Sequence, residues 1–360
     1  MKIRDRYIAK TILSYTIIVL VVWTSIYSFF NFLAELNSVG KNGYTILSAF
    51  TYIIFQLPEV AYKQASPIIL LGCILGMGHL ATTGQLLIFR VSGASILKIT
   101  LLTLKNSLIF ILFFISIGEF LAPISSNLAK SSKSNVMGNS SASINQNGFW
   151  IRDGDNFINV KRNIDGTLFS GITVIEVNSL NEIERVIKSE NAIFDGDSLD
   201  MSGSEIFSID GSSFIDGISL KERNSYDKTV SFDQDLIDSL EKEPEDLSTW
   251  TLFKQIRFLS DNKLRSGIFE VELYKRLIQP VTLIAMILLA MLFIFGSTRD
   301  VTLGRKIFFG LALGLSFEML SRIASAMALS LDLNPLMSSI LPSIVVMLIS
   351  IIFLLQKSFR

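Results

Sequence analysis

Several stretches of this sequence contain few or no charged residues and are long enough to cross a membrane. A membrane-spanning α-helix needs about 20 apolar residues, and half of all residues in the chain are hydrophobic. Six stretches qualify as predicted transmembrane helices, and the first, second, fourth and sixth contain no Asp, Glu, Lys or Arg: 11–34, 64–89, 99–122, 277–298, 306–330 and 333–356. The first has no small-residue cleavage site after it, so we interpret it as a retained helix rather than a signal peptide.

The basic residues between these helices predict the orientation of the chain. Short loops rich in Lys and Arg stay on the cytoplasmic side of a membrane. Six spans with both termini in the cytoplasm bring four groups of basic residues to that side: Lys2, Arg4, Arg6 and Lys10; Arg90 and Lys98; Arg299, Arg305 and Lys306; Lys357 and Arg360. Residues 123–270 are then periplasmic.

A seventh uncharged stretch, residues 42–58, is not counted as a span. Counting it would move two of the basic loops to the outside of the membrane. Pro58, Glu59 and Lys63 also end the apolar run early. We predict an interfacial or buried periplasmic helix that leads into the second span.

The middle of the chain is acidic and has the pattern of a β domain. Residues 123–246 hold 22 of the 32 acidic residues but only 11 of the 32 basic ones. Asp-Gly pairs separate short alternating segments, as in β-hairpins, which predicts an all-β sandwich or jelly roll after a Ser- and Asn-rich linker at 130–147. The predicted strands lie at 149–152, 156–161, 171–177, 192–194, 205–209 and 218–221. Residues 246–276 read as helical from about Ser248 and return to the membrane.

No group of residues in the chain indicates catalysis, a metal or a cofactor. The acidic middle contains no histidine, and its carboxylates are scattered at turns. The single cysteine, Cys73, cannot form a disulfide within the chain. A phosphate-binding Gly-x4-Gly-Lys-Ser/Thr loop is absent. If ATP drives this protein, we expect another chain to hydrolyse it.

The predicted organisation is an α+β membrane protein with a β domain inserted between the third and fourth helices. Residues 1–125 hold the first three transmembrane helices and a cytoplasmic helix at about 83–92. Residues 126–245 hold the periplasmic jelly-roll domain, and residues 246–360 hold a connecting helix and the last three spans.

Motifs along almost the whole chain resemble the lipopolysaccharide export permease family, LptF/LptG. The last of them, after the fourth span, favour the LptG branch over the LptF branch. In chain order the motifs are Asp5-Arg6-Tyr7-Ile8; Pro58, Pro67 and Gly72; Ser92-Gly93; Gly118-Glu119 with Ala122-Pro123; Gly148-x-Trp150-x-Arg152-Asp153-Gly154-x-x-Phe157-Ile158; Gln279-Pro280; and Phe293-Ile294-Phe295-Gly296 with Arg299, Gly304 and Arg305.

This resemblance implies a permease subunit in the inner membrane of a Gram-negative bacterium. It implies a heterodimer of LptF and LptG types bound to two LptB ATPases, and LptC as a further partner with the same β fold. The machine would extract lipopolysaccharide from the outer leaflet, which would enter sideways near spans one and five and pass to the periplasmic β domains. Membrane lipids surround such a protein, and nucleic acid is not expected as a partner.

The resemblance also implies two functional regions. Residues 84–90 match the family's coupling helix, where we expect Gln85, Leu86, Phe89 and Arg90 to contact the ATPase; Gln85 replaces the family's usual Glu. The family often has basic residues at the end of span one, but this chain has Asn31, Asn37 and Ser38, with Lys41 a little further on.

The fifth span offers a possible substitute for these missing charges. Glu318 and Arg322, beside Phe317, share one helical face at i, i+4 spacing. Arg322 lies 17 residues beyond Arg305, about 25 Å along a helix, which is outer-leaflet depth. The pair either binds lipid phosphates or neutralises itself against a partner subunit.

Three other classes remain as alternatives. They are an LptF-type sister subunit or a permease for another lipid, a lipoprotein-release-type mechanical transporter, and a membrane-anchored sensor or periplasmic enzyme. The mechanical transporters have four spans with the large domain after the first, so the span count discriminates. A sensor needs an output domain and an enzyme needs a catalytic cluster.

Overall fold

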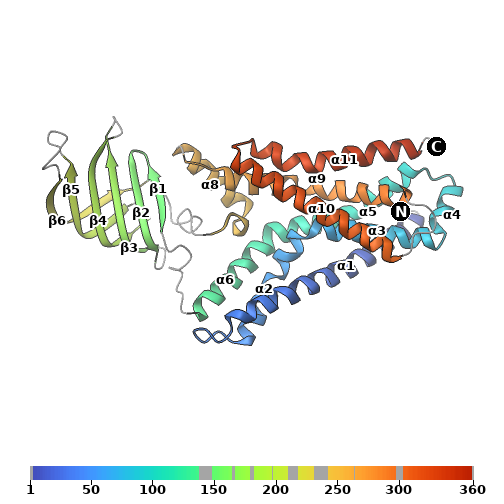
Figure 1. The fold of residues 1–360 in the computed structure, drawn as a ribbon, viewed down its shortest axis with the longest axis horizontal. Helices are drawn as coiled ribbons and strands as arrows, with labels where there is room; N and C mark the ends of the chain where they lie inside the picture. The colour runs from blue at the N-terminus through green and yellow to red at the C-terminus, as the bar shows by residue number, and fades with distance from the viewer. Residues whose placement is uncertain are drawn as a thin grey trace. The chain divides into compact units, whose positions relative to one another are not determined.

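The computed structural model describes residues 3–137, 148–163, 167–178, 182–196, 198–209, 218–230, 242–262, 264–296 and 303–358. The chain forms two compact units (Figure 1). The helical unit comprises residues 1–39, 46–129 and 267–360, and the β unit comprises residues 40–45 and 130–266. Each unit is described by itself below.

The helical unit contains the predicted membrane helices. Among the described residues, six helices are long and apolar enough to span a membrane, which confirms the predicted number. The helices of the chain in this part are α1 (Ile3–Glu35), α2 (Ile46–Lys63), α3 (Ala65–Thr82), α4 (Gln85–Val91), α5 (Ile96–Ser116), α6 (Ala122–Val136), α9 (Gly267–Gly296), α10 (Leu303–Ser330) and α11 (Pro335–Ser358). A short 3-10 helix, η1 (Leu36–Ser38), follows α1, and a π-helix, η2 (Ile117–Leu121), joins α5 to α6.

The segment at 42–58 is helical, as predicted, and is not one of the six candidate spans. It forms most of α2, which ends at Lys63 and is followed, after Gln64, by α3. Backbone hydrogen bonds from Gln64 N to Val60 O and from Ile68 N to Gln64 O carry the helical path across the junction. The second span therefore begins as the continuation of α2.

Helix α3 is the centre of the helical unit. In its most apolar window 78% of the residues are buried, against 6% for the window in α1 and 17% for that in α10. It packs against α1, α9 and α10. Its many small residues allow this close packing, because they let neighbouring backbones approach. The faces of α1 and α10 that remain exposed are therefore available to lipid or to another chain.

The third span differs from the prediction at its far end. Ser95 caps α5, its side chain accepting a hydrogen bond from Lys98 N, and the helical path continues through η2 and α6 to Val136. Residues 130–136, predicted as part of a linker, are the last turns of α6, so that part of the prediction is wrong. The Ser-rich composition suggested a loop, but Ala129 is fully buried and Lys130 is held by acidic partners. Residues 138–147 lie outside the described chain.

The described part of the β unit contains one antiparallel sheet whose strands pair in chain order, which confirms the all-β prediction. The Asp153-Gly154 and Asp195-Gly196 pairs lie at hairpin turns, as expected, whereas the predicted turns at 165–166, 210–211 and 216–217 fall outside the described residues. The strands are β1 (Phe149–Asp153), β2 (Asn156–Asn163), β3 (Leu168–Val177), β4 (Ile183–Phe194), β5 (Ser198–Ile209) and β6 (Ile218–Thr229). Several are longer than the segments seen in the sequence.

This single sheet curls so that distant strands meet. The register of the β5–β6 pairing shifts between Met201 and Ser204, which makes a β-bulge around Gly203, whereas the β2–β3 pairing keeps the same register on both sides of Gly171. Gly171 and Gly203 have φ of 70° and 69°, a left-handed conformation that residues with a Cβ seldom adopt. Bulges of this kind bend a sheet sharply. Opposite parts of one curled sheet thus form the two packed layers that a sandwich or jelly roll requires.

The concave side of the curled sheet is filled by its own apolar side chains. The rings of Phe169 and Phe194 lie 6.0 Å apart within it. Phe258, from helix α8 (Thr249–Asp261), packs against the same cluster. The buried members are Ile151, Ile158, Val160, Phe169, Ile172, Val174, Ile187, Ala192, Phe194, Leu199, Met201 and Val230.

A charged cluster joins strands that are not neighbours in the sheet. Glu176 on β3 accepts hydrogen bonds from Lys228 (2.5 Å) and Tyr226 (2.9 Å) on β6, and Arg185 on β4 lies 3.2 Å away. Burial alone would raise the pKa of Glu176, but the hydrogen bonds from Lys228 and Tyr226 outweigh it and lower the pKa. Burial and the bond to Glu176 raise the pKa of Tyr226 to about 12.

Helix α8 begins where the sequence predicted and ends sooner. Ser248 caps it by accepting a hydrogen bond from Thr251 N at 3.1 Å. The helix ends at Asp261, so the predicted helical stretch of 246–276 is interrupted between α8 and α9. Leu252, Gln255 and Leu259 face inward.

Candidate functional site

A short helix lies in the loop where the coupling helix was expected. Helix α4 spans Gln85–Val91, between Gly84 and Gly93, which have φ of 74° and 86°. The hydroxyls of Thr82 and Thr83 bond to the carbonyls of Gly78 and His79 and close the last turn of α3. The two-residue turn holds α4 directly against the end of α3.

The faces of α4 differ from the expectation. Leu86 is only 6% exposed, and Phe89 is half-buried against the hydrophobic core, so both hold the helix in place. Ile88 and Val91 are 65% and 81% exposed, with Leu87 and Arg90 also exposed. The outward face is thus Leu87, Ile88, Arg90 and Val91, whereas the sequence led us to expect Leu86 and Phe89 there. The buried Oε1 of Gln85 accepts no hydrogen bond from the described residues.

The expected ion pair of the fifth span is present on α10. Arg322 Nε lies 3.1 Å from Glu318 Oε1, and the Arg322 side chain is 69% exposed. Exposed Met319 and Ile323 flank it. Phe317 is buried in the core and therefore faces away from this surface. The pair presents a guanidinium in the middle of an otherwise apolar face.

The residues expected at the end of the first span are spread over both units. Asn31 is half-buried near the end of α1, Asn37 is exposed in η1, and Ser38 is half-buried beside it. Lys41 is exposed in the β unit. The structure therefore brings together Glu318 and Arg322, but it does not place Lys41 in the same unit as them.

The family resemblance pointed to spans one and five, but sequence reasoning did not identify the exposed apolar faces of α1 and α10. On α1 the exposed side chains follow the helix for several turns: Ile17, Ile18, Val21, Val22, Ile26, Phe29, Phe30 and Leu33. On α10 they are Leu315, Met319, Leu320, Ile323 and Met327. Both helices are apolar nearly all round, so their sequences alone do not show which face is covered.

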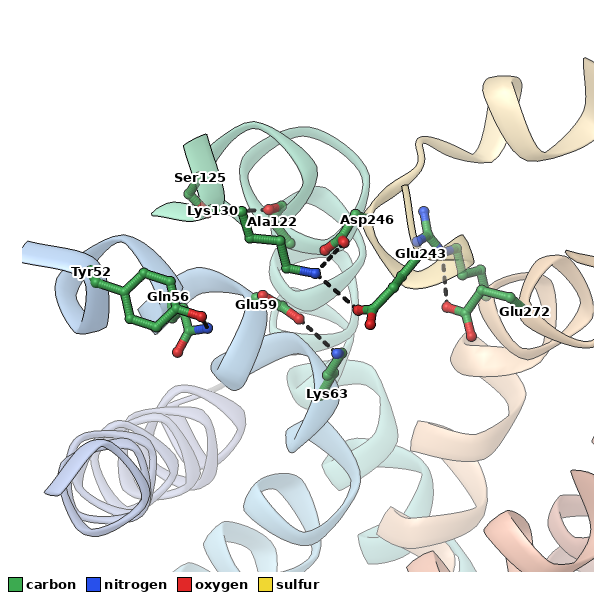
Figure 2. Close-up of polar contacts among 11 residues, drawn as sticks. Tyr52, Gln56, Glu59, Lys63, Ala122, Ser125, Lys130, Glu243, Asp246 and Glu272 are labelled. Atoms are coloured by element: carbon green, nitrogen blue, oxygen red, sulfur yellow. Dashed lines mark hydrogen bonds and ion pairs between the residues drawn. The ribbon is translucent and has the colours of Figure 1, made fainter. Parts of the chain in front are cut away.

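Charged pairs at helix ends were also missed. Lys63 Nζ lies 2.6 Å from Glu59 at the end of α2 (Figure 2). Arg276 Nε lies 3.3 Å from Glu272 near the start of α9. The i, i+4 spacing of the oppositely charged residues was the feature of the sequence from which both pairs could have been predicted.

A third pairing ties together the two ends of the segment that contains the sheet (Figure 2). Lys130 Nζ, on α6, donates to Glu243 at 2.9 Å and also to Asp246, whose side chain is buried. Asp246 belongs to the short 3-10 helix η4 (Pro244–Asp246), which precedes α8. These contacts fasten the entering chain to the leaving chain within the β unit.

Within the described ranges, no three His, Cys, Asp or Glu side chains gather as a metal site. The candidate surfaces are therefore the exposed face of α4 and the exposed apolar faces of α1 and α10.

Comparison with known proteins identifies the family. The model of the family "Lipopolysaccharide export system permease LptF/LptG" matches residues 6–356. Lipopolysaccharide export system permease protein LptG of Escherichia coli K12 is 26% identical over 359 residues, covering 98% of both chains. The LptG protein of Haemophilus influenzae is 26% identical over 344 residues, covering 94% of both. The chain belongs to the LptF/LptG family of lipopolysaccharide export permeases.

Proposed function

We propose that this chain is an LptG-type permease subunit of an ATP-driven transporter. Such a transporter would extract lipopolysaccharide from the outer leaflet of the inner membrane and pass it to a periplasmic β-domain bridge. The matched relatives carry the name LptG, which favours this type over LptF. Six candidate spans with the sheet between the third and the fourth argue against a four-span mechanical transporter.

The proposed orientation puts both termini, α4 and the loop at 297–306 in the cytoplasm. The β unit is then periplasmic. The basic groups at the chain ends and in these loops support this orientation, because positive charge is retained on the cytoplasmic side.

The outward face of α4 is the single observation that carries the ATP-driven part of the proposal. Leu87, Ile88 and Val91 expose apolar surface around the charge of Arg90, a combination suited to a helix that docks in a groove. The occupant we propose is an LptB-type ATPase, one of two in the assembly. Gln85, Leu86 and Phe89 would set the angle at which α4 presents that face.

The lipid would enter along α1 and α10, between this subunit and an LptF-type partner. Arg322 offers a guanidinium that can bind a phosphate bidentately, and Glu318 holds it when no lipid is present. Asn31, Asn37 and Ser38 offer hydrogen-bonding groups, and Lys41 offers a charge. Phe317 would support α10 from behind. An LptC-type protein would receive the lipid.

One purification tests the ATPase and lipid contacts together. The full chain is purified in mild detergent from membranes, and the proteins and lipid that accompany it are identified. Ile88→Ser should reduce the recovery of ATPase at least fivefold, whereas Ile183→Ser, which alters an exposed isoleucine of β4, should leave it unchanged. Equal recovery in both variants would remove α4 as the docking helix.

The lipid arm of the same experiment uses two arginines that make similar exposed i, i+4 pairs. Arg322→Ala should lower the lipopolysaccharide recovered per mole of protein. Arg257→Ala, which breaks the pair with Asp261 on α8, should not. Recovery that is unaffected by Arg322→Ala would show that the Glu318–Arg322 pair only neutralises itself.

A further inference from the structure

A buried lysine connects α10 to the last turn of α3. Lys306 lies in the first turn of α10, and its side chain is only 6% exposed. Its Nζ donates a hydrogen bond to the carbonyl oxygen of Gly78 on α3 at 3.3 Å. A lysine seldom buries its amine without a partner, and here the described partner is a backbone carbonyl more than 200 residues away in the chain.

The surrounding packing makes this contact part of a long, close interface. A Cβ added at Gly78 would lie 3.3 Å from Lys306 Cδ, so a side chain there would press on the lysine. Further along α10, a Cβ at Gly310 would lie 2.7 Å from Leu71, and one at Gly314 would lie 3.1 Å from Pro67. Helix α10 therefore lies against α3 along several turns, and Lys306 closes the end nearest α4.

The turn that receives this hydrogen bond is the turn that carries α4. Gly78 also accepts a hydrogen bond from the hydroxyl of Thr82, the last residue of α3, and only two residues separate Thr82 from α4. A displacement of α4 therefore acts directly on the turn that Lys306 holds. Moving the Gly78 carbonyl away would leave the buried amine of Lys306 without this partner, which is costly. The first turn of α10 is therefore expected to move with the last turn of α3.

We propose that Lys306 is a positioning residue that transmits movement of the docking helix α4 through the last turn of α3 to α10. The inference rests on the proposed function, in which α4 meets an ATPase and α10 borders the lipid path. It adds a mechanical link between them: ATP-driven displacement of α4 shifts α10 because Lys306 joins the two through Gly78.

A second lysine provides a matched control. Lys357 on α11 donates a hydrogen bond to the carbonyl oxygen of Phe295 near the end of α9, at 3.1 Å. The chemistry is the same, and the bond again joins two helices by an amine and a backbone carbonyl. Among the described residues, Lys357 makes no hydrogen bond or ion pair with α3 or α4. If Lys306 only fastened helix ends, the two lysines would be equivalent.

The test measures lipid released per ATP hydrolysed. The full chain, purified with its accompanying ATPase and partner subunit, is reconstituted in liposomes with lipopolysaccharide and a soluble periplasmic acceptor. Lys306→Met should retain the ATPase and hydrolyse ATP near the wild-type rate. The lipid released per ATP should fall about tenfold, because losing one charge-assisted hydrogen bond costs enough free energy for a tenfold effect. Lys306→Arg should recover part of the ratio, and Lys357→Met should keep the wild-type ratio.

Two results would overturn the proposal. One is a wild-type ratio in Lys306→Met, and the other is an equal fall in Lys357→Met. If Lys306→Met does not accumulate in the membrane, two other variants decide. Lys306→Arg alters the donor, and Gly78→Ala presses an added Cβ against Lys306 Cδ, 3.3 Å away. Both must lower the lipid released per ATP relative to wild type. Failure of the wild-type chain to retain an ATPase at all would instead refute the proposed function.

Discussion

Gly72 lies in the middle of α3, where α1 crosses it most closely. A Cβ added at Gly72 would lie 2.4 Å from Thr16 Oγ1 and 2.7 Å from Thr16 Cα. Carbon atoms in contact are about 3.5–4 Å apart. Because Thr16 Cα belongs to the backbone, no rotamer change relieves the clash. Gly72→Ala must therefore push α1 away from α3 by close to 1 Å.

The size of the effect follows from two opposing terms. Overpacking a close interface lowers the free energy of unfolding by about 1–3 kcal/mol, and by more where backbone must move. Replacing Gly by Ala in a helix raises the free energy of unfolding by about 1 kcal/mol. For Gly72→Ala we expect a net decrease of about 2 kcal/mol in the free energy of unfolding. Gly304 on α10 has no atom within 4 Å of an added Cβ, so Gly304→Ala should be neutral or slightly stabilising.

The buried Cys73 beside Gly72 supplies the assay. It is the only cysteine in the chain and is 1% exposed. A dye that becomes fluorescent on reacting with thiols therefore reports unfolding of the helical unit during heating in detergent. Gly72→Ala should lower the melting temperature by about 5 °C, judged from the usual relation between stability and melting temperature, and Gly304→Ala should not. Equal melting temperatures for the two variants would refute the close-contact argument.

Three further outcomes are expected. The pKa of Glu176 is lowered from its ordinary value of about 4.5, so its ionised form stabilises the β unit above that pH, and this stabilisation is lost as the pH falls through the lowered pKa. Calorimetry between pH 3 and 7 should therefore show that acid lowers the stability of Glu176→Gln less than that of wild type. An equal loss of stability in the two proteins would exclude this role. Ser248→Ala should lower the protection of α8 amides against hydrogen exchange by about 1 kcal/mol. Ser260→Ala, on the exposed side of the same helix, should leave it unchanged. Unaltered protection in Ser248→Ala would show that the cap is dispensable. With Cys73 replaced by Ser, a cysteine at Ser140 should react with an impermeant thiol reagent added outside the inner membrane, and one at Thr83 should not; labelling of Thr83→Cys from outside would reject the proposed orientation.

The elements of this fold that could be predicted from sequence are those set by composition over many residues. Exclusion of charge from the bilayer marks the six spans, because burying an unpaired charge in hydrocarbon is expensive. The Asp-Gly turns at 153–154 and 195–196 mark hairpins, because those residues suit tight turns. The helical nature of 42–58 and the start of a helix near Ser248 were visible for similar local reasons.

What could not be predicted depends on which neighbour each residue meets. Helix α4 has seven residues, too few for a periodic pattern, so nothing in its sequence shows that Leu86 turns inward and Ile88 outward. Residues 130–136 have the composition of a linker, and only the partners of Lys130 explain why the helix continues. The sequence shows glycines at 72 and 78 but not that Thr16 and Lys306 lie against them.

The candidate site was foreseen as positions in the chain rather than as a surface. The i, i+4 pairing of Glu318 with Arg322 is a local property of a helix, so the sequence was sufficient to find it. The burial of Phe317 on the opposite side depends on α10 packing against its neighbours. The placement of Lys41 in the other unit likewise depends on how the chain folds after α1.

The central position of α3 has a consequence for how the protein is made. Two of the helices that bury it, α9 and α10, begin at Gly267 and Leu303, whereas α3 ends at Thr82. A ribosome adding about 5–20 residues per second therefore needs roughly ten seconds or more after finishing α3 to supply the last of its neighbours. During that interval α1 is already available to cover one side of this glycine-rich helix, but the surfaces that α9 and α10 will cover stay uncovered. The inserted β unit accounts for most of the delay, so the core of the helical unit cannot be completed until that whole segment has been synthesised.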